Sequence, residues 1–257
     1  MRNEGLVEAI RAAGGVSELA RRIGIAQPSV SNWDRVPADR VAAVEAATGV
    51  PRAKLRPDLF AEGIVSEADE IEAARAQEYA LLASLLSAAP SRDFLSALAK
   101  LRGDATLLGV AHAALSDAAD SITQADAERE YFDLFVGIGR GELLPYGSYY
   151  LAGFLNERPL ARLRADLARF GIERTDATVE PEDHAAILCE IMAGLAGGTF
   201  EKPVGADREL FDRHLAPWIG RFFADLESAE AADFYRRVGT LGRLFITIES
   251  EAFALPS

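Results

Sequence analysis

The sequence predicts an all-α protein, and three features of its pattern support this fold class. Apolar residues recur at intervals of three and four positions along most of the 257 residues, as on the buried face of a helix. No run of strand length is built from alternating Val, Ile or Thr. Glycine and proline separate the periodic stretches, as expected where helices begin and end. We expect a small helix-turn-helix domain over residues 1–60, followed by a larger all-helical domain over residues 61–257.

The composition favours a reducing compartment and partners of two kinds. The single cysteine, Cys189, excludes an internal disulfide, and no apolar run is long enough to span a membrane, so we expect a cytoplasmic location. Residues 1–60 contain nine lysines and arginines and seven acids, a net charge of +2, whereas the whole chain carries −13. Residues 61–257 therefore carry −15. This acidic part should repel nucleic acid and attract a basic peptide.

The first part has the punctuation of a compact helical module. A short apolar stripe at Leu6–Ile10 stops at a pair of glycines, and further helices are expected over residues 17–23, 27–33 and 38–48. Gly24 follows the first of these three as the turn residue, because glycine adopts the left-handed conformation without steric cost.

This spacing resembles the Cro/YdaS-type phage-repressor domains over roughly residues 4–59. Short polar side chains on the second helix of the motif could contact base edges or phosphates, which makes them the candidate DNA-binding residues. They are Gln27, Ser29, Ser31 and Asn32. A module that no longer binds DNA is the alternative, since a net charge of +2 is small for a protein that must neutralise phosphates. A protein-interaction module is a further alternative.

A linker is expected over residues 57–68, and the acidic body follows it. Ser91 is expected to cap a helix, Pro181 to lie in a first helical turn, and Pro217 to kink or restart a helix. The expected helices run over residues 66–90, 91–101, 104–122, 151–170, 184–195, 207–226 and 231–253.

The stretch from Glu130 to Tyr150 combines a helical start with a glycine-rich corner. Its apolar side chains form one helical stripe that extends to Ile138. Glycines at 137, 139 and 141 then break the helical pattern, and Pro145 precedes a group of three tyrosines. This pattern indicates a surface where backbone approaches a partner closely. A tight helix–helix connection with tyrosines filling the core is the alternative.

Three stretches in this order resemble the TorD/DmsD/NarJ-like redox-enzyme maturation chaperones. They are residues 131–151, the Glu-Pro-Glu-Asp-His run at 180–184, and the His-Leu-Ala-Pro-Trp run at 214–218. The resemblance covers about residues 70–253. It implies an all-helical protein that binds the twin-arginine signal peptide, or another segment, of a molybdenum-cofactor enzyme in the cytoplasm until the cofactor is inserted. It also implies that a homodimer could form by exchange of helices.

The residues that match the family's motifs are the candidate peptide-binding residues. They comprise an aromatic helix, a Pro-x-x-Ser-x-Tyr pattern in which a tyrosine stands where relatives often have tryptophan, and an acidic hinge motif. They are Tyr131, Phe132, Phe135, Pro145, Tyr146, Ser148, Tyr150, Glu180, Asp183 and His184. A twin-arginine peptide needs carboxylates for its guanidinium groups and aromatic surface for its apolar run. For the residues at 180–184 an ordinary helix N-terminus is the alternative.

We expect no catalytic residue, no cofactor and no metal. The chain has no Gly-x-Ser-x-Gly and no Walker-type loop, and Cys189 has no Cys-x-x-Cys partner. The leading hypothesis is a chaperone for a molybdoenzyme, with a formate dehydrogenase, a dimethyl sulfoxide reductase or a trimethylamine oxide reductase as the open choices of client. The alternative is a transcription regulator whose helical body senses a client or ligand.

Overall fold

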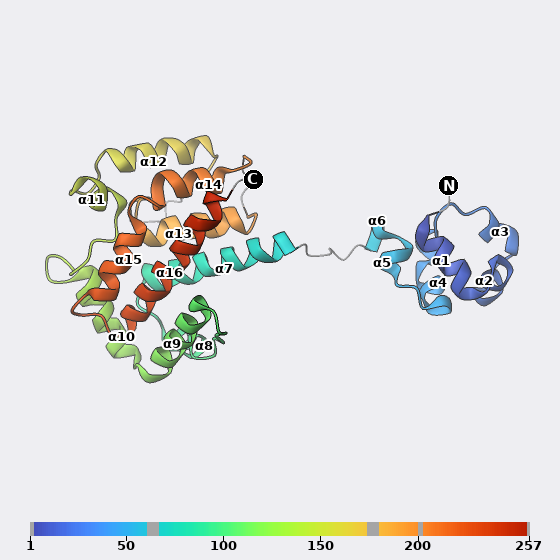
Figure 1. Cartoon of the computed structure of the whole chain (residues 1–257), viewed down its shortest axis with the longest axis horizontal. Helices are drawn as coiled ribbons and strands as arrows, with labels where there is room; N and C mark the ends of the chain where they lie inside the picture. The colour runs from blue at the N-terminus through green and yellow to red at the C-terminus, as the bar shows by residue number, and fades with distance from the viewer. Residues whose placement is uncertain (1–2, 61–66, 174–179, 200–202, 256–257) are drawn as a thin grey trace. The chain divides into compact units, whose positions relative to one another are not determined.

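The computed structural model describes residues 3–60, 67–173, 180–199 and 203–255, and no strand forms among these residues. The chain divides into two compact units, residues 1–69 and 70–257, each with its own hydrophobic core (Figure 1). The all-α prediction is therefore confirmed. A domain boundary after residue 60 stays a prediction. No described helix combines the length and the apolar character that a membrane span needs.

The first unit consists of short helices around a small aliphatic core. The predicted turn residue Gly24 has φ +71° and separates α2 from α3. Gly5 on α1 packs so closely on α5 that a Cβ there would collide with the carbonyl oxygen of Lys54. The elements are α1 (Glu4–Ala13), α2 (Val16–Arg22), α3 (Gln27–Ser31), the 3-10 turn η1 (Ala38–Arg40), α4 (Val41–Thr48), α5 (Arg52–Leu55) and α6 (Pro57–Phe60). The core includes Leu6, Leu19, Val30, Val44 and Leu55.

The linker predicted over residues 57–68 is too long at both ends. Pro57–Phe60 forms α6, because proline is compatible with a first helical turn, and α7 is already helical at Glu67. Residues 61–66, which include the predicted opening of a helix at Ser66, lie outside the described residues.

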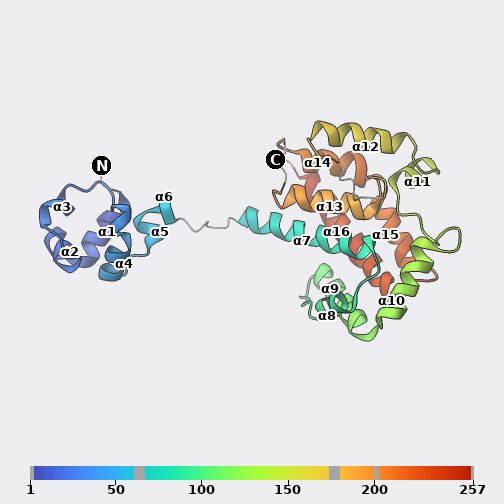
Figure 2. The ribbon, with the colours of Figure 1, turned by 180° about the vertical axis from the view of Figure 1, so that it is seen from behind.

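The second unit is built around α7 and α16, which both views place at the middle of the unit (Figures 1 and 2). The Tyr79 and Phe245 rings meet edge to face at 4.7 Å, and the Tyr79 hydroxyl donates to Glu249 at 2.9 Å. α15 and α16 pack so closely that a Cβ at Gly242 would collide with the Phe223 ring. The helices are α7 (Glu67–Ser87), α8 (Arg92–Leu98), α9 (Leu107–Ser121), α10 (Gln124–Tyr131), α11 (Gly147–Ala152), α12 (Arg158–Arg169), α13 (Ala185–Ala196), α14 (Ala206–Leu210), α15 (Ile219–Ser228) and α16 (Phe234–Ala254), with π-helical turns η2 (Phe132–Val136) and η3 (Phe211–Leu215).

Two local predictions are confirmed. Ser91 caps α8, since its side chain accepts from the Phe94 N–H. The predicted helix over residues 207–226 is interrupted around Pro217, between η3 and α15, because proline cannot donate the backbone hydrogen bond that a continuous helix needs.

Three predictions are wrong. The helix predicted over residues 151–170 is two helices, because the chain turns between α11 and α12 through Gly153 and Asn156, whose φ values are +82° and +59°. Pro181 lies in a turn before α13 rather than inside it, since His184 is the N-cap of that helix. Ile138 does not belong to a buried stripe: it is 98% exposed, because η2 ends before it at Gly137.

Candidate functional site

The glycine corner is a tight reversal that follows α10 and η2. Gly137 has φ +61°, and a Cβ there would collide with the carbonyl group of Arg140, so only glycine fits. The chain then returns along its own path, with the Leu143 N–H donating to the Leu134 carbonyl at 2.8 Å. The reversal leaves Ile138 exposed at its tip and directs the following residues toward α11.

Backbone and side-chain hydrogen bonds join the start of α11 to the residues that precede α13. The Pro145 carbonyl accepts from the Ala185 N–H at 2.8 Å, and the Gly147 N–H donates to the Asp183 carbonyl at 2.9 Å. The Ser148 N–H donates to Asp183 Oδ2 at 2.7 Å, and both of these residues are buried. Two predicted motifs that are 35 positions apart in the sequence therefore form one junction, which fixes the position of α11.

An aromatic contact closes the same junction on its outer side. Tyr146 and His184 form an isolated antiparallel bridge, and their rings meet edge to face at 5.0 Å. The Tyr146 hydroxyl donates to Glu180 Oε2 at 2.6 Å. Burial raises the pKa of Tyr146, and the hydrogen bond to Glu180 adds to this increase. Burial lowers the pKa of His184, whose Nδ1 accepts from the backbone of α13, so the neutral ring is favoured at this position.

The predicted peptide-binding residues fall into buried and accessible groups. Pro145, Ser148, Asp183 and His184 are buried in the junction. Tyr131 and Phe135 pack on the ring of Tyr235, at centroid distances of 5.9 and 5.4 Å. Phe132 and Glu180 are exposed, and Tyr146 and Tyr150 are half-buried, as are Tyr131 and Phe135. The structure thus brings most of the predicted residues together, but several of them hold α11 in place instead of facing solvent.

One cavity lies on the side of α11 that carries Tyr149 and Tyr150. It has a volume of about 420 Å³ and is lined by Glu142, Leu143, Leu144, Tyr149, Tyr150, Gly153, Arg221 and Asp225; we call it the tyrosine cavity. The Tyr150 hydroxyl donates to Asp225 at 2.9 Å, and burial together with this carboxylate raises the pKa of Tyr150. The Arg221 guanidinium lies 5.6 Å from the centre of the Tyr150 ring. The cavity therefore offers aromatic faces and carboxylates side by side.

A second cavity lies on the side of α11 that carries Gly147 and Leu151. It has a volume of about 450 Å³ and is lined by Gly147, Leu151, Arg158, Pro159, Arg162, Leu163, Asp183, Arg213, His214 and Pro217; we call it the arginine cavity. His214 Nε2 is 2.8 Å from Asp166 Oδ2, and this hydrogen bond fixes the orientation of the His214 ring. Gly147 is also close-packed, since a Cβ there would lie 3.0 Å from Trp218 Nε1. α11 thus contributes to two cavities of different charge, each with a different set of its residues.

Comparisons with known proteins find a matching family model for each part of the chain. Residues 102–224 match the family model described as nitrate reductase delta subunit, and residues 6–64 match the one described as bacterial toxin YdaS. We call the parts of the chain that contain these two matches the delta-subunit domain and the YdaS domain. Its curated relatives include chaperone proteins named TorD. The TorD protein of Vibrio cholerae is 29% identical over 60% of this chain and 75% of its own length. The TorD protein of Aliivibrio fischeri is 26% identical over 70% of this chain and 94% of its own length. The resemblances drawn from the sequence are confirmed.

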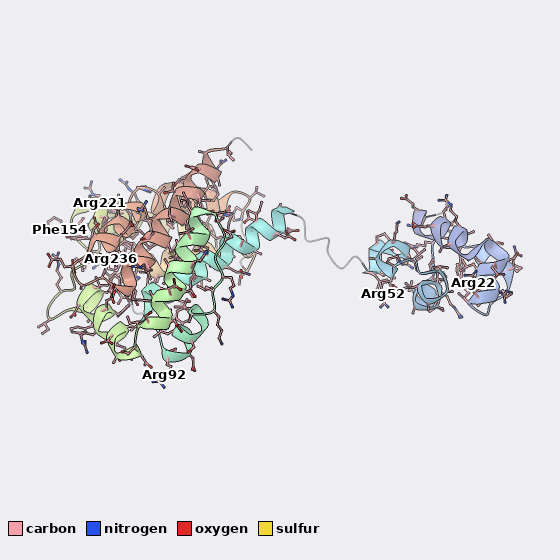
Figure 3. All side chains as sticks on the ribbon, turned by 60° about the horizontal axis from the view of Figure 1, so that its bottom comes forward. Arg22, Arg52, Arg92, Phe154, Arg221 and Arg236 are labelled. Carbon is pink, nitrogen blue, oxygen red and sulfur yellow. The ribbon has the colours of Figure 1, made fainter. Side chains whose placement is uncertain are left out.

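Three large apolar side chains are exposed in the delta-subunit domain, although the sequence pattern places them in a helix over residues 151–170. They are Leu151, Phe154 and Leu155, at the end of α11 and in the turn that follows, and we call them the apolar ridge. Phe154 is 72% exposed, and Figure 3 shows it at the same end of the unit as Arg221. Gly153, Asn156 and Pro159 were the signals in the sequence for a turn here.

Asp225, Arg158 and Arg162 were also missed. None of these residues belongs to a short motif, and their relation to α11 depends on the tertiary fold. The arginines could have been noticed because Pro159 favours the first turn of a helix, where cations are unfavourable.

In the YdaS domain the predicted DNA-binding residues lie on or beside α3. Gln27, Ser29 and Asn32 are exposed, and the Gln27 side chain donates to Ser31 at 2.8 Å. Over residues 3–60, every arginine and lysine except Arg11 forms an ion pair with an acid of the same domain, including Arg22 and Arg52 (Figure 3). Exposed pairs of this kind are weak, so phosphates could replace these acids as partners.

Among the described residues, no group of three or more His, Cys, Asp or Glu is arranged to hold a metal ion. Burial raises the pKa of the Cys189 thiol to about 12, so the reactive thiolate form is disfavoured.

Proposed function

We propose that this chain is a chaperone for the maturation of a molybdenum-cofactor oxidoreductase, and that it acts in the cytoplasm. The observation that carries the proposal is the match to chaperones named TorD over three quarters or more of their length. The ordered motifs at residues 131–151 and 180–184 support it, since they resemble those of maturation chaperones. The delta-subunit domain binds a segment of the client and performs no reaction on it.

The client segment binds across α11. The apolar ridge supports this placement, because soluble proteins seldom expose neighbouring large apolar side chains without a partner. The glycine corner adjoins the same surface, since Arg140 of the corner lies 5.8 Å from the Tyr149 ring of α11. An apolar stretch of the client covers Leu151, Phe154 and Leu155, and Ile138 at the tip of the corner extends the surface that the client contacts.

Basic residues of the client bind in the tyrosine cavity. Asp225 and Glu142 provide carboxylates there, and the faces of Tyr149 and Tyr150 attract cations through their ring quadrupoles. The net charge of −15 over residues 61–257 draws a basic segment toward this surface. Of the residues predicted from the motifs, Tyr146, Tyr150 and Glu180 contact the client at the edge of α11, and Asp183 and Ser148 hold the helix in position.

Titration calorimetry with peptides tests this proposal. The peptides cover the N-terminal segments of a formate dehydrogenase, a dimethyl sulfoxide reductase and a trimethylamine oxide reductase, with and without their twin arginines. We expect Phe154→Ser to weaken binding roughly tenfold, since burial of a phenylalanine side chain contributes about 1.5 kcal/mol or more. Leu107→Ser is the matched control, because Leu107 is 75% exposed at the start of α9. Failure of every such peptide to bind the intact chain would reject the proposal.

A second function, DNA binding by the YdaS domain, is favoured by the exposed polar side chains of α3. In this case the chaperone domain reports the presence of free client to a promoter. Fluorescence anisotropy with the DNA upstream of the gene, at several salt concentrations, tests it. We expect Gln27→Ala and Asn32→Ala to weaken specific binding and Ser17→Ala, an exposed change on α2, to leave it unaltered. Equal affinity of all variants for specific and unrelated DNA would exclude sequence-specific binding through α3.

A further inference from the structure

The arginine cavity contains two cations without an acidic partner among the described residues. Arg158 and Arg162 line it from the first two turns of α12, and neither forms an ion pair within the described part of the chain. Other arginines of the same helix are paired: Arg164 with Glu182 at 2.8 Å, and Arg169 with Glu209. The contrast within one helix singles out the pair that faces the cavity.

The position of these two cations is unfavourable for the isolated helix. They are four residues apart, so their side chains are neighbours on the helix surface and repel each other. Arg158 also lies in the first turn of the helix, where the macrodipole favours negative charge. An anion bound between the two arginines would relieve both effects. The whole chain has a net charge of −13, whereas the lining of this cavity contains three arginines and one carboxylate.

A third arginine reaches the cavity from η3 and is held in place there. Arg213 pairs with Asp166 at 3.0 Å and with Glu209 at 2.9 Å, and the neighbouring His214 contacts the same Asp166. The arginine cavity thus combines two free guanidinium groups on one wall with an oriented one on another. Planar guanidinium groups in such an arrangement suit the two oxygens of a carboxylate.

We propose that the arginine cavity binds the carboxylate side chain of an acidic residue in the client segment. The proposal rests on the proposed chaperone function and adds a second recognition point to it. Leu151 lines the arginine cavity and also belongs to the apolar ridge, so a chain that covers the ridge enters this cavity directly. The client therefore carries its basic residues on one side of an apolar run and its acidic residue on the other.

A polypeptide carboxylate suits this cavity better than a phosphate does. Asp183 lines it and adds a negative charge, which repels a doubly charged phosphate more strongly than a singly charged carboxylate. The remaining lining is largely apolar, from Leu151, Pro159, Leu163 and Pro217. An aspartate or glutamate within an apolar peptide matches both features.

Fluorescence anisotropy with two labelled peptides tests the proposal on the full chain. The first peptide carries two arginines, a run of leucine and phenylalanine, and two glutamates, in that order; in the second, glutamines replace the glutamates. We expect the second peptide to bind the wild-type chain about tenfold more weakly. The double variant Arg158→Gln, Arg162→Gln should bind both peptides with the same reduced affinity, because removal of one partner already removes the interaction. Added salt should reduce the difference between the two peptides.

Arg92→Gln is the matched control. Arg92 is the first residue of α8, as Arg158 is of α12, it is exposed, and it lies far from Phe154 and Arg221 in Figure 3. Equal affinity of both peptides for the wild-type chain would overturn this inference and leave the chaperone function intact. Release of the glutamate peptide by submillimolar inorganic phosphate would also overturn it, in favour of a phosphate ligand. Failure of both peptides to bind would overturn the inference together with the peptide-binding function on which it rests.

Discussion

Replacement of Asp183 separates a structural role of this carboxylate from direct contact with the client. Asp183 Oδ2 accepts from the buried Ser148 N–H at 2.7 Å, and Asp183 itself is buried. Asp183→Ala leaves that N–H without an acceptor at the start of α11. A hydrogen bond to a charged group contributes about 2 kcal/mol, and an unsatisfied buried donor costs a similar amount. Asp183→Asn keeps a carbonyl oxygen at the same place, so we expect it to retain most of the stability.

We expect Asp183→Ala to lower the free energy of unfolding by about 2 kcal/mol, which corresponds to roughly 4–8 °C in melting temperature for a domain of this size. Urea denaturation of the full chain measures the free energy of unfolding, and hydrogen exchange of residues 147–152 reports on α11 itself. Peptide affinity should fall only in the alanine variant, in proportion to the lost protection of α11. If both variants lost peptide binding while the protection of α11 and the urea midpoint stayed unchanged, Asp183 would contact the client directly and the reasoning would be refuted.

Three further changes test the energetics of the second unit. Glu130→Ala should lower the free energy of unfolding by roughly 3 kcal/mol, because the Glu130 carboxylate accepts from three backbone N–H groups at the start of α16; urea denaturation measures this, and a loss near zero would contradict it. The hydrogen bond to Glu78 raises the pKa of His112, against the effect of burial. The contact with Glu78 therefore stabilises the folded state fully below the unfolded histidine pKa of about 6.5, and this stabilisation is lost as the pH rises through the raised folded pKa. The difference in free energy of unfolding between wild type and His112→Gln, measured by urea denaturation, should therefore shrink at alkaline pH. Tyr150→Phe removes the hydrogen bond to Asp225 and should cost about 1 kcal/mol by the same measurement, with no change in the position of α11.

Local signals predicted the elements that depend on local chemistry. Ser91 caps a helix because its hydroxyl reaches a backbone N–H three residues on, which is a property of the short sequence alone. Gly24 and Pro217 likewise act through their own backbone geometry. The helix-turn-helix arrangement and the helical fold class follow from many such signals that agree with one another.

Two of the wrong predictions, the helix over residues 151–170 and the stripe that extends to Ile138, equate apolar periodicity with burial. Phe154 and Leu155 continue a helical pattern from Leu151, yet they lie exposed in a turn after Gly153. Ile138 fits the stripe of the preceding helix and is exposed as well. Periodicity records which residues are apolar, and a surface that binds an apolar partner has the same composition as a core. The proposed function uses these exposed apolar residues, Ile138, Phe154 and Leu155, as the surface that the client covers.

The candidate site was predicted in part for a related reason. A motif identifies residues that cooperate, but it does not tell which of them face solvent. Tyr146 and Glu180 form a direct hydrogen bond across 34 positions of sequence, which supports the prediction that they act together. Asp183 belongs to the same motif and is buried against Ser148. Burial is decided by the packing of α11 on the start of α13, which no local pattern records.

In the proposed complex, the position of α11 determines the direction in which the client segment binds. The tyrosine cavity on one side of this helix contains two carboxylates and one guanidinium, and the arginine cavity on the other side contains three guanidinium groups and one carboxylate. A peptide that crosses the apolar ridge with its basic end in the tyrosine cavity gains from both, and the reversed peptide meets like charge at each end. Like-charge contacts at an interface cost several kcal/mol, so they discriminate against the wrong partner or orientation. Under the proposed function, the junction through Asp183 contributes to binding indirectly, because it fixes the position of α11 between the two cavities.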